Sequence, residues 1–390
     1  MSAAITGTRV DEVLRTAVES GTLPNVVATA ANADGPIYEG AFGPKAVGQP
    51  APVTVNTLYR IASMTKMVTT VAALQLVERG ELDLDDAVAK FRPEFADLKV
   101  LDGWDGDEPR LREPKSFATV RQLMTHTSGL GYWFWNADLV RWEATTGTGN
   151  TLAGTKDAFT APLVADPGER VEYGTNTDWL GLVVEAVSGQ PLDAYFDEHI
   201  LGPLGMEQAT FHPTDQQREN LVAVHLHDEQ TGAWNATSVD WNAAPDWWPG
   251  GHGLYCPPSE YLRFQRMLLN NGALDGARIL GAETVEAAFS NQIGDLDWPE
   301  AIATAEPPTT ADFNAGPGYK FGLGLLRNTQ DVPGMRRAGS GAWAGIFNTH
   351  FWLDRAAGIT GAIYTQTLPF VEPEVFQVYV DFETALYASL

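Results

Sequence analysis

The chain contains 390 residues, 44% of them hydrophobic, which is enough to bury a large core without covalent cross-links. Its 25 Lys and Arg residues and 50 Asp and Glu residues give a net charge of −25, which disfavours binding to nucleic acid or to an anionic membrane surface. The single cysteine, Cys256, excludes an internal disulfide framework and a multi-cysteine metal site. The sequence shows neither a membrane-spanning apolar run nor a secretory leader, so we expect a cytoplasmic protein.

The N-terminal part has the pattern of a helix followed by two strands. Apolar residues recur at helical spacing over residues 8–20 and predict a helix there. The segments 25–30 and 37–42 predict strands, and the pair Asp34-Gly35 between them is typical of a hairpin turn.

The strongest helical pattern covers residues 63–78, and Gly80 lies where a C-cap glycine is expected. The middle of the chain alternates short helices with long loops, among them an acidic, turn-rich segment at 102–113. The other segments expected to be helical are 120–124, 177–188, 259–270 and 375–386. Strands are expected at 321–326, 345–353 and 359–365. Helices and strands at both ends, around an irregular middle, indicate one sheet built from both termini.

A serine and a lysine, three residues apart, open the strongest predicted helix. Ser63 and Lys66 therefore occupy neighbouring positions on one helix face, near the positive end of the helix. A serine hydroxyl becomes a good nucleophile once a base removes its proton, and a buried lysine with a lowered pKa is such a base. The lysine lies in an otherwise apolar run, which favours catalysis over an N-cap serine followed by a surface lysine.

Further sequence blocks accompany the Ser63-Met64-Thr65-Lys66 segment. Their residues are 80–86 (GELDLDD), 123–130 (LMTHTSGL), 167–173 (PGERVEY), 250–255 (GGHGLY) and 259–264 (SEYLRF). Together with the Ser-x-x-Lys motif, they resemble the blocks of the class C β-lactamase-like serine hydrolases, in the same order. The matches run from about residue 55 to residue 355, so the resemblance covers most of the chain.

This resemblance implies an α/β fold, an α+β sandwich like that of the β-lactamases and penicillin-binding proteins. In it, an antiparallel sheet flanked by helices carries a mainly helical, loop-rich inserted domain. We expect residues 1–80 and 315–390 to form the α/β domain and residues 81–314 to form the inserted domain.

The resemblance also implies the roles of the site residues. Ser63 would be the acylated nucleophile, and Lys66 would be its base or the partner of that base. Tyr173 would share the proton with Lys66 and pass it to the leaving group, its phenolate being favoured by the adjacent ammonium. The backbone N–H groups of Ser63 and Ile346 would form the oxyanion hole. The resemblance implies no metal and no organic cofactor.

Two segments depart from the β-lactamase pattern. The second motif reads Tyr-Gly-Thr-Asn, so Thr175 and Asn176 are both candidates for substrate contact. The Lys-Thr-Gly motif is absent, and Trp343 lies in its place, in a segment that resembles the WGG-type motif of family VIII carboxylesterases. The missing lysine helps to bind a substrate carboxylate, so its loss favours neutral esters, although Arg336 and Arg337 upstream offer positive charge.

Aromatic residues crowd the loops expected around the cleft. They form a large apolar pocket for bulky esters, or they anchor long loops that lack regular structure, and the sequence leaves both interpretations open. The substrate-pocket candidates, in addition to those named above, are Tyr132, Trp133, Trp135 and His252.

Three other features have simpler explanations. His126 has no Gly-x-Ser-x-Gly serine to serve, so we expect it to organise its own loop. His225 and His227 have a spacing suited to a metal but no third ligand at a sensible distance in sequence. Cys256 is expected to be packed in the core. We therefore expect no metal site.

The leading hypothesis is a serine carboxylesterase acting on a small-molecule ester. Three alternatives remain open: an amide hydrolase of the same fold (a D-aminopeptidase, a DD-peptidase-like enzyme or a weak β-lactamase), an acyltransferase, and a catalytically silent binding domain. The sequence leaves the oligomeric state undetermined.

Overall fold

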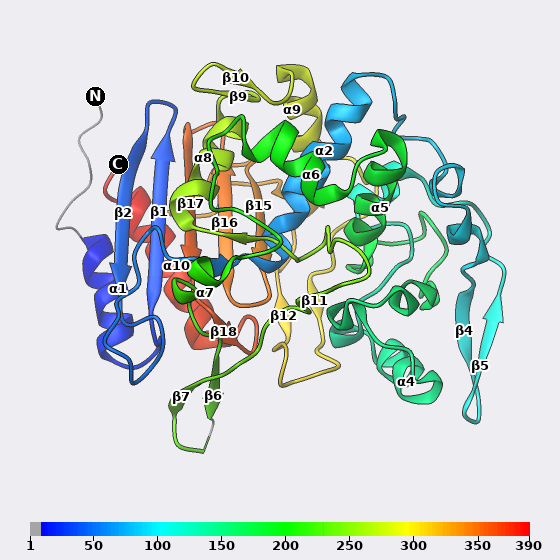
Figure 1. The fold of residues 1–390 in the computed structure, drawn as a ribbon, viewed down its shortest axis with the longest axis horizontal. Coiled ribbons are helices and arrows are strands. Elements are labelled where there is room, and N and C mark those ends of the chain that lie inside the picture. The colour runs from blue at the N-terminus through cyan, green and yellow to red at the C-terminus, as the bar shows by residue number, and fades with distance from the viewer. Residues whose placement is uncertain (1–8, 229) are drawn as a thin grey trace.

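A seven-stranded antiparallel sheet is the main sheet of the computed structural model, which describes residues 9–228 and 230–390, and it lies in the left half of the view in Figure 1. Its strands, in spatial order, are β13 (Tyr319–Phe321), β14 (Leu326–Asn328), β15 (Gly341–Gly345), β16 (Thr349–Asp354), β17 (Ile359–Tyr364), β1 (Val26–Asn32) and β2 (Pro36–Phe42). Strand β1 pairs with β2 on one side and with β17 on the other, so the sheet joins both ends of the chain. The sheet expected from the sequence is therefore confirmed, and the domain boundaries stay a prediction.

Helices cover both faces of this sheet (Figure 1). On one face, α1 (Arg9–Glu19) and α10 (Pro373–Tyr387) pack together in a core that also contains Trp352 of β16. On the other face, α8 (Pro258–Leu269) packs against the central strands, in a larger core that includes α2 (Thr65–Glu78) and α5 (Asn176–Ser188). These helices match the predicted segments within two residues, except that residue 8 lies outside the described residues and the strongest predicted segment begins with a separate turn.

Smaller elements surround this framework. The short helices are α3 (Val120–Met124), α4 (Ala137–Thr146), α6 (Leu192–Phe196), α7 (Asp215–Glu219) and α9 (Ala282–Phe289). The short strands are β3 (Tyr59–Arg60), β4 (Val100–Asp105), β5 (Glu108–Arg112), β6 (His225–Asp228), β7 (Ala233–Ala236), β8 (Tyr255–Cys256), β9 (Ala273–Leu274), β10 (Ala277–Arg278), β11 (Ala301–Ile302), β12 (Phe313–Asn314) and β18 (Thr367–Leu368). None of the helices in the described ranges is long and apolar enough to cross a membrane.

Three sequence predictions were wrong in detail. The predicted strand 345–353 is the end of β15, a turn and most of β16, and Asn348 in the turn has a φ of +58°. The predicted strand 321–326 likewise contains a turn, in which Gly324 has a φ of +77°. In both places, the turn lies within a mostly apolar segment, so the sequence pattern reads as one continuous strand. The acidic segment 102–113, expected as a loop, forms most of the hairpin β4–β5.

Helix α2 is buried around its whole circumference, whereas its sequence pattern predicts a helix with one apolar face. Its polar residues Lys66, Thr69 and Thr70 are at most 1% exposed. The threonine hydroxyls satisfy their hydrogen bonds through backbone carbonyls, those of residues 65 and 250 for Thr69 and that of residue 66 for Thr70. The helix therefore passes through the centre of the protein, and Lys66 is buried with it.

Candidate active site

Ser63 lies on a 3₁₀ turn, Ala62–Met64, immediately before α2. Strand β15 lies directly against this turn. A Cβ atom on Gly345 would be 2.4 Å from the carbonyl oxygen of Ile61, so glycine is needed for this close approach. Ala62 has a φ of +46°, a left-handed conformation that is unfavourable for a residue with a side chain. The turn holds Ser63 at the edge of a cavity and outside the first turn of the α-helix.

Lys66 reaches Ser63 from the first turn of α2. Its Nζ lies within hydrogen-bond distance of Ser63 Oγ at 3.1 Å, the Tyr132 hydroxyl at 3.0 Å and the carbonyl oxygen of Gly251 at 2.7 Å. Burial lowers the pKa of Lys66 to about 7, while the negative charge of Asp178 acts in the opposite direction. Near neutral pH, a large fraction of Lys66 is therefore uncharged and able to accept a proton.

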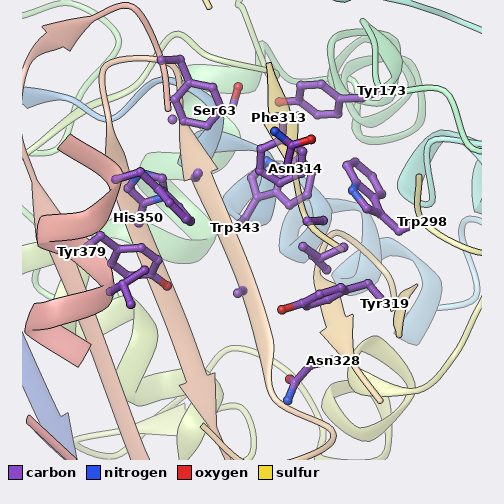
Figure 2. A pocket seen from close by; sticks show the side chains of 18 of the residues that line it. Ser63, Tyr173, Trp298, Phe313, Asn314, Tyr319, Asn328, Trp343, His350 and Tyr379 are labelled. Carbon is purple, nitrogen blue, oxygen red and sulfur yellow. The ribbon is translucent and has the colours of Figure 1, made fainter. Parts of the chain in front are cut away.

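Tyr173 approaches Ser63 from the loop before α5, with its hydroxyl pointing towards the serine (Figure 2). Its ring centroid is 5.0 Å from Lys66 Nζ. Burial raises the pKa of Tyr173, and the nearby Ser63 hydroxyl opposes this effect without cancelling it. Burial therefore acts against the phenolate that the resemblance implies, and it favours the neutral phenol in the resting protein.

An apolar cavity of about 230 Å³ lies beside Ser63 (Figure 2). Trp343 forms part of its wall, and the neighbouring Ala342 and Ala344 of β15 leave room for a ligand. Further aromatic residues of the wall come from the segment after α9 and from the C-terminal part of the chain: Trp298, Phe313, Tyr319, Phe370, Phe376 and Tyr379. The cavity is thus suited to a bulky apolar group.

The predicted pocket residues divide into two sets. Trp343 and Trp135 line the cavity at Ser63. Trp133, which belongs to the same 3₁₀ turn as Trp135, lines a separate small pocket together with Thr175. The structure does not bring these last two side chains to the cavity: Phe134 and Trp135 of the turn line it, whereas Trp133 and Thr175, which precedes α5, line the other pocket.

Tyr132 and His252 lie on the Lys66–Asp178 side of the site and are not part of the cavity wall. The Tyr132 hydroxyl contacts Lys66, and His252 Nδ1 lies 3.6 Å from Asp178 Oδ1. Both side chains are buried. They therefore shape the environment of Lys66.

Asn176 is also outside the cavity wall. Its side-chain oxygen accepts a hydrogen bond from the Ser128 hydroxyl, and its amide nitrogen donates to the carbonyl oxygen of Leu130 at 3.3 Å. The side chain is fully buried. Asn176 therefore fixes the loop that carries Tyr132.

The positive charge that the sequence offered near β15 is neutralised. Arg336 is part of the cavity wall, but its guanidinium pairs with the buried carboxylate of Glu383 on α10, with Nε donating to Oε1 at 2.9 Å. Burial alone would lower the pKa of Arg336, but the charge of Glu383 keeps it above its ordinary value. The Arg337 side chain donates to the carbonyl oxygen of Ala356 at 3.3 Å and is not part of the wall. Neither arginine is available to a substrate carboxylate.

His126 packs directly against the site. Its ring centroid lies 4.7 Å from that of Tyr173 and 6.0 Å from that of Trp343, with which it stacks. Burial lowers the pKa of His126 well below its ordinary value, and the charge of Lys66 adds to the effect. A neutral His126 therefore supports Tyr173 from behind, beyond the expected role in its own loop.

His225 and His227 have separate partners. His225 Nε2 accepts a hydrogen bond from the backbone N–H of Val47 at 3.2 Å, and His227 Nδ1 lies 2.6 Å from Glu372. Across residues 9–228 and 230–390, no group of three His, Cys, Asp or Glu side chains is placed to hold a metal ion. Cys256 is buried, as expected.

Sequence reasoning missed Asp178, a fully buried carboxylate in the first turn of α5 that lies next to both Tyr132 and Gly251. The signal that points to it is an acidic residue inside an apolar helical segment, because a buried carboxylate needs partners.

A family model described as Beta-lactamase matches residues 10–386, nearly the whole chain. The chain belongs to this family. It is therefore an enzyme of the β-lactamase fold, in a family whose members include acyltransferases and esterases.

Individual relatives are similar along most of their length. Monacolin J acid methylbutanoyltransferase from Aspergillus terreus is 31% identical, over 97% of this chain and 95% of that protein. Lovastatin esterase from Penicillium rubens is 30% identical, over 90% of each chain. The solved structure of unliganded Simvastatin Synthase (LovD) from Aspergillus terreus has a TM-score of 0.86, with 29% identity and 97% of each chain covered. Family members thus carry names for acyl transfer and for ester hydrolysis.

Proposed function

We propose that this chain is a serine carboxylesterase that cleaves neutral esters through an acyl-enzyme on Ser63. The observation that carries the proposal is the buried Lys66 amine, 3.1 Å from Ser63 Oγ, beside an apolar cavity. A tryptophan in place of the motif lysine and the pairing of Arg336 with Glu383 leave that cavity without a free positive charge, which favours an uncharged substrate.

The reaction begins with proton transfer from Ser63 to the neutral amine of Lys66, while Oγ attacks the ester carbonyl carbon. The backbone N–H groups of Ser63 and Ile346 stabilise the oxyanion, each by about 3 kcal/mol. Tyr173 then donates its hydroxyl proton to the leaving alkoxide and regains a proton from Lys66, as the ester C–O bond breaks. In the second half-reaction, Lys66 and Tyr173 remove a proton from water, which attacks the acyl carbon. The bond from this carbon to Ser63 Oγ then breaks, Oγ takes the proton back from these groups, and the carboxylic acid is released.

Labelling with a fluorophosphonate tests this proposal. Intact-mass measurement should detect one adduct per chain, and the adduct should disappear in Ser63→Ala, because the probe reacts with an activated serine. Ser20→Ala, which changes an exposed serine just after α1, serves as the matched control and should label normally. An adduct that persists in Ser63→Ala would refute the assignment.

The kcat/KM values for p-nitrophenyl butyrate and the matched p-nitroanilide then separate an esterase from an amide hydrolase.

The pH dependence of ester cleavage should follow the ionisation of Lys66. Below its pKa of about 7, Lys66 is an ammonium without a lone pair, so kcat/KM should fall about tenfold per pH unit on the acid side and level off above neutrality. Initial rates at low substrate concentration between pH 5 and about 9 measure this fall in kcat/KM on the acid side, the acid limb of the pH profile. A rate that stays constant down to pH 5 would exclude Lys66 as the base.

Acyl transfer is the second candidate, and it is favoured by the 31% identity to a protein named as a methylbutanoyltransferase. An apolar cavity beside the acylated serine also favours an organic alcohol over water as the acceptor. Adding increasing concentrations of an alcohol to a p-nitrophenyl butyrate reaction measures how the butyryl group is divided between the alcohol and water. A new butyrate ester formed at the expense of butyric acid would establish transfer, and butyric acid alone would establish hydrolysis.

A further inference from the structure

A buried carboxylate lies close to Lys66, the proposed catalytic base, and is not part of the cavity wall. Asp178 is 0% exposed, and its Oδ1 accepts a hydrogen bond from the backbone N–H of Gly251 at 2.7 Å. Its Oδ2 accepts a hydrogen bond from the Tyr132 hydroxyl at 3.4 Å. A Cβ atom at position 251 would lie 2.6 Å from both carboxylate oxygens, so the glycine is needed for this contact. The mechanism described above makes no use of Asp178.

Both partners of Asp178 are also partners of Lys66. The carbonyl oxygen of Gly251 lies 2.7 Å from Lys66 Nζ, and the oxygen of Tyr132 lies 3.0 Å from it. A carbonyl oxygen can only accept a hydrogen bond. The Tyr132 hydroxyl has a single hydrogen, and because this hydrogen is directed to Asp178, the Tyr132 oxygen also acts as an acceptor towards Lys66.

These directions determine where the lone pair of Lys66 points. A neutral amine has two hydrogens and one lone pair. If the hydrogens go to Gly251 and Tyr132, the lone pair is left for Ser63 Oγ, the remaining neighbour at 3.1 Å. We propose that Asp178 is a positioning residue, which directs the Lys66 lone pair at Ser63 by fixing the hydrogen bonds of Tyr132 and Gly251. This inference rests on the proposed function, because it concerns the proton transfer from Ser63.

The charge of Asp178 adds a measurable signature. The titratable groups that face Lys66 from the surrounding elements are Tyr132, Tyr173, Asp178 and His126, and His252 lies against Asp178. Among these side chains, Asp178 carries the negative charge, and this charge raises the pKa of Lys66 against the larger effect of burial. Removing the charge should therefore move the acid limb of the pH profile to lower pH.

The variant Asp178→Asn tests the role directly. Its amide can donate to the Tyr132 oxygen, which leaves the Tyr132 hydroxyl free to donate to the lone pair of Lys66 and block it. We expect kcat to fall about 10- to 100-fold with little change in KM, and the acid limb to move down by about half a pH unit or more. Asp215→Asn, which changes an exposed acid in the first turn of α7, is the matched control and should behave as the unchanged protein.

A double variant makes the test specific. Adding Tyr132→Phe to Asp178→Asn removes the competing hydroxyl, so the double variant should have a higher kcat than Asp178→Asn alone. If Asp178 has a purely structural role, the losses in kcat caused by the two substitutions should multiply, and the acid limb of the pH profile should stay at its original pH. Either result would overturn the inference. If Asp178→Asn fails to fold, as judged by circular dichroism, Gly251→Ala replaces it. Its Cβ displaces the same carboxylate and should produce the same shift of the limb.

Failure of this inference is distinguishable from failure of the proposed function. If the unchanged protein forms no fluorophosphonate adduct on Ser63, the proposed function itself is wrong. If the adduct forms and esters are cleaved, but Asp178→Asn keeps the original pH profile, only the role of Asp178 is wrong.

Discussion

Replacing Lys66 with alanine is expected to lower kcat/KM for p-nitrophenyl butyrate by about three orders of magnitude or more, the scale of a lost general base. Its Nζ is 3.1 Å from Ser63 Oγ, and burial keeps it partly neutral at neutral pH. Tyr173→Phe should have an effect of similar size, because it removes the proton donor to the leaving group. The double variant should be little worse than either single variant, since both residues serve one proton transfer.

The control for this experiment is a lysine of the same chain that lies outside the site. Lys90 is solvent-exposed and pairs with Asp86, so Lys90→Ala should leave ester cleavage unchanged. Circular dichroism and thermal unfolding establish that Lys66→Ala is folded. A folded Lys66→Ala protein that keeps its rate within tenfold would show that another group removes the Ser63 proton.

Replacing Gly345 with alanine is expected to lower kcat by about 100-fold or more, the size of effect seen when one oxyanion donor is lost. The new Cβ would lie 2.4 Å from both the carbonyl oxygen of Ile61 and the hydroxyl of Thr349. Strand β15 must then move away from the turn that carries Ser63. This movement shifts the proposed oxyanion donor, the backbone N–H of Ile346, away from the reacting carbonyl.

The matched control for that variant is Gly35→Ala in the hairpin between β1 and β2. A Cβ atom there meets no heavy atom within 4 Å, and Gly35 has no positive φ. This variant should keep full activity. An active Gly345→Ala protein, with kcat within a fewfold of the original, would show that the contact between β15 and the serine turn is not required.

The order of the sequence motifs was sufficient to predict the family and the contact between Ser63 and Lys66. Ser63 and Lys66 are close in sequence, so local helical geometry nearly fixes their separation. Tyr173 came from the resemblance, and the structure brings its hydroxyl to Ser63. The protonation state of this tyrosine did not follow from the sequence, because it depends on burial by residues that are distant along the chain.

The wall of the cavity and the residues that hold Lys66 were much harder to predict. The wall includes Trp298 and Tyr379, which carry no motif and meet only through the packing of α10 and the segment after α9 against the sheet. The aromatic run 132–135 was noticed, but whether each ring faces the cavity depends on a single 3₁₀ turn. Asp178 was missed for a similar reason: its partners lie in two loops that local sequence patterns do not connect.

The position of β1 between β2 and β17 has a consequence for biosynthesis. A ribosome makes Ser63, Lys66 and β1 long before the partner strand Ile359–Tyr364. Until then, β1 has an unpaired edge that can pair with another chain, and β15 is not yet available to complete the oxyanion site. The nascent chain thus carries Ser63 and Lys66 long before β15 and β17 can complete the proposed site around them.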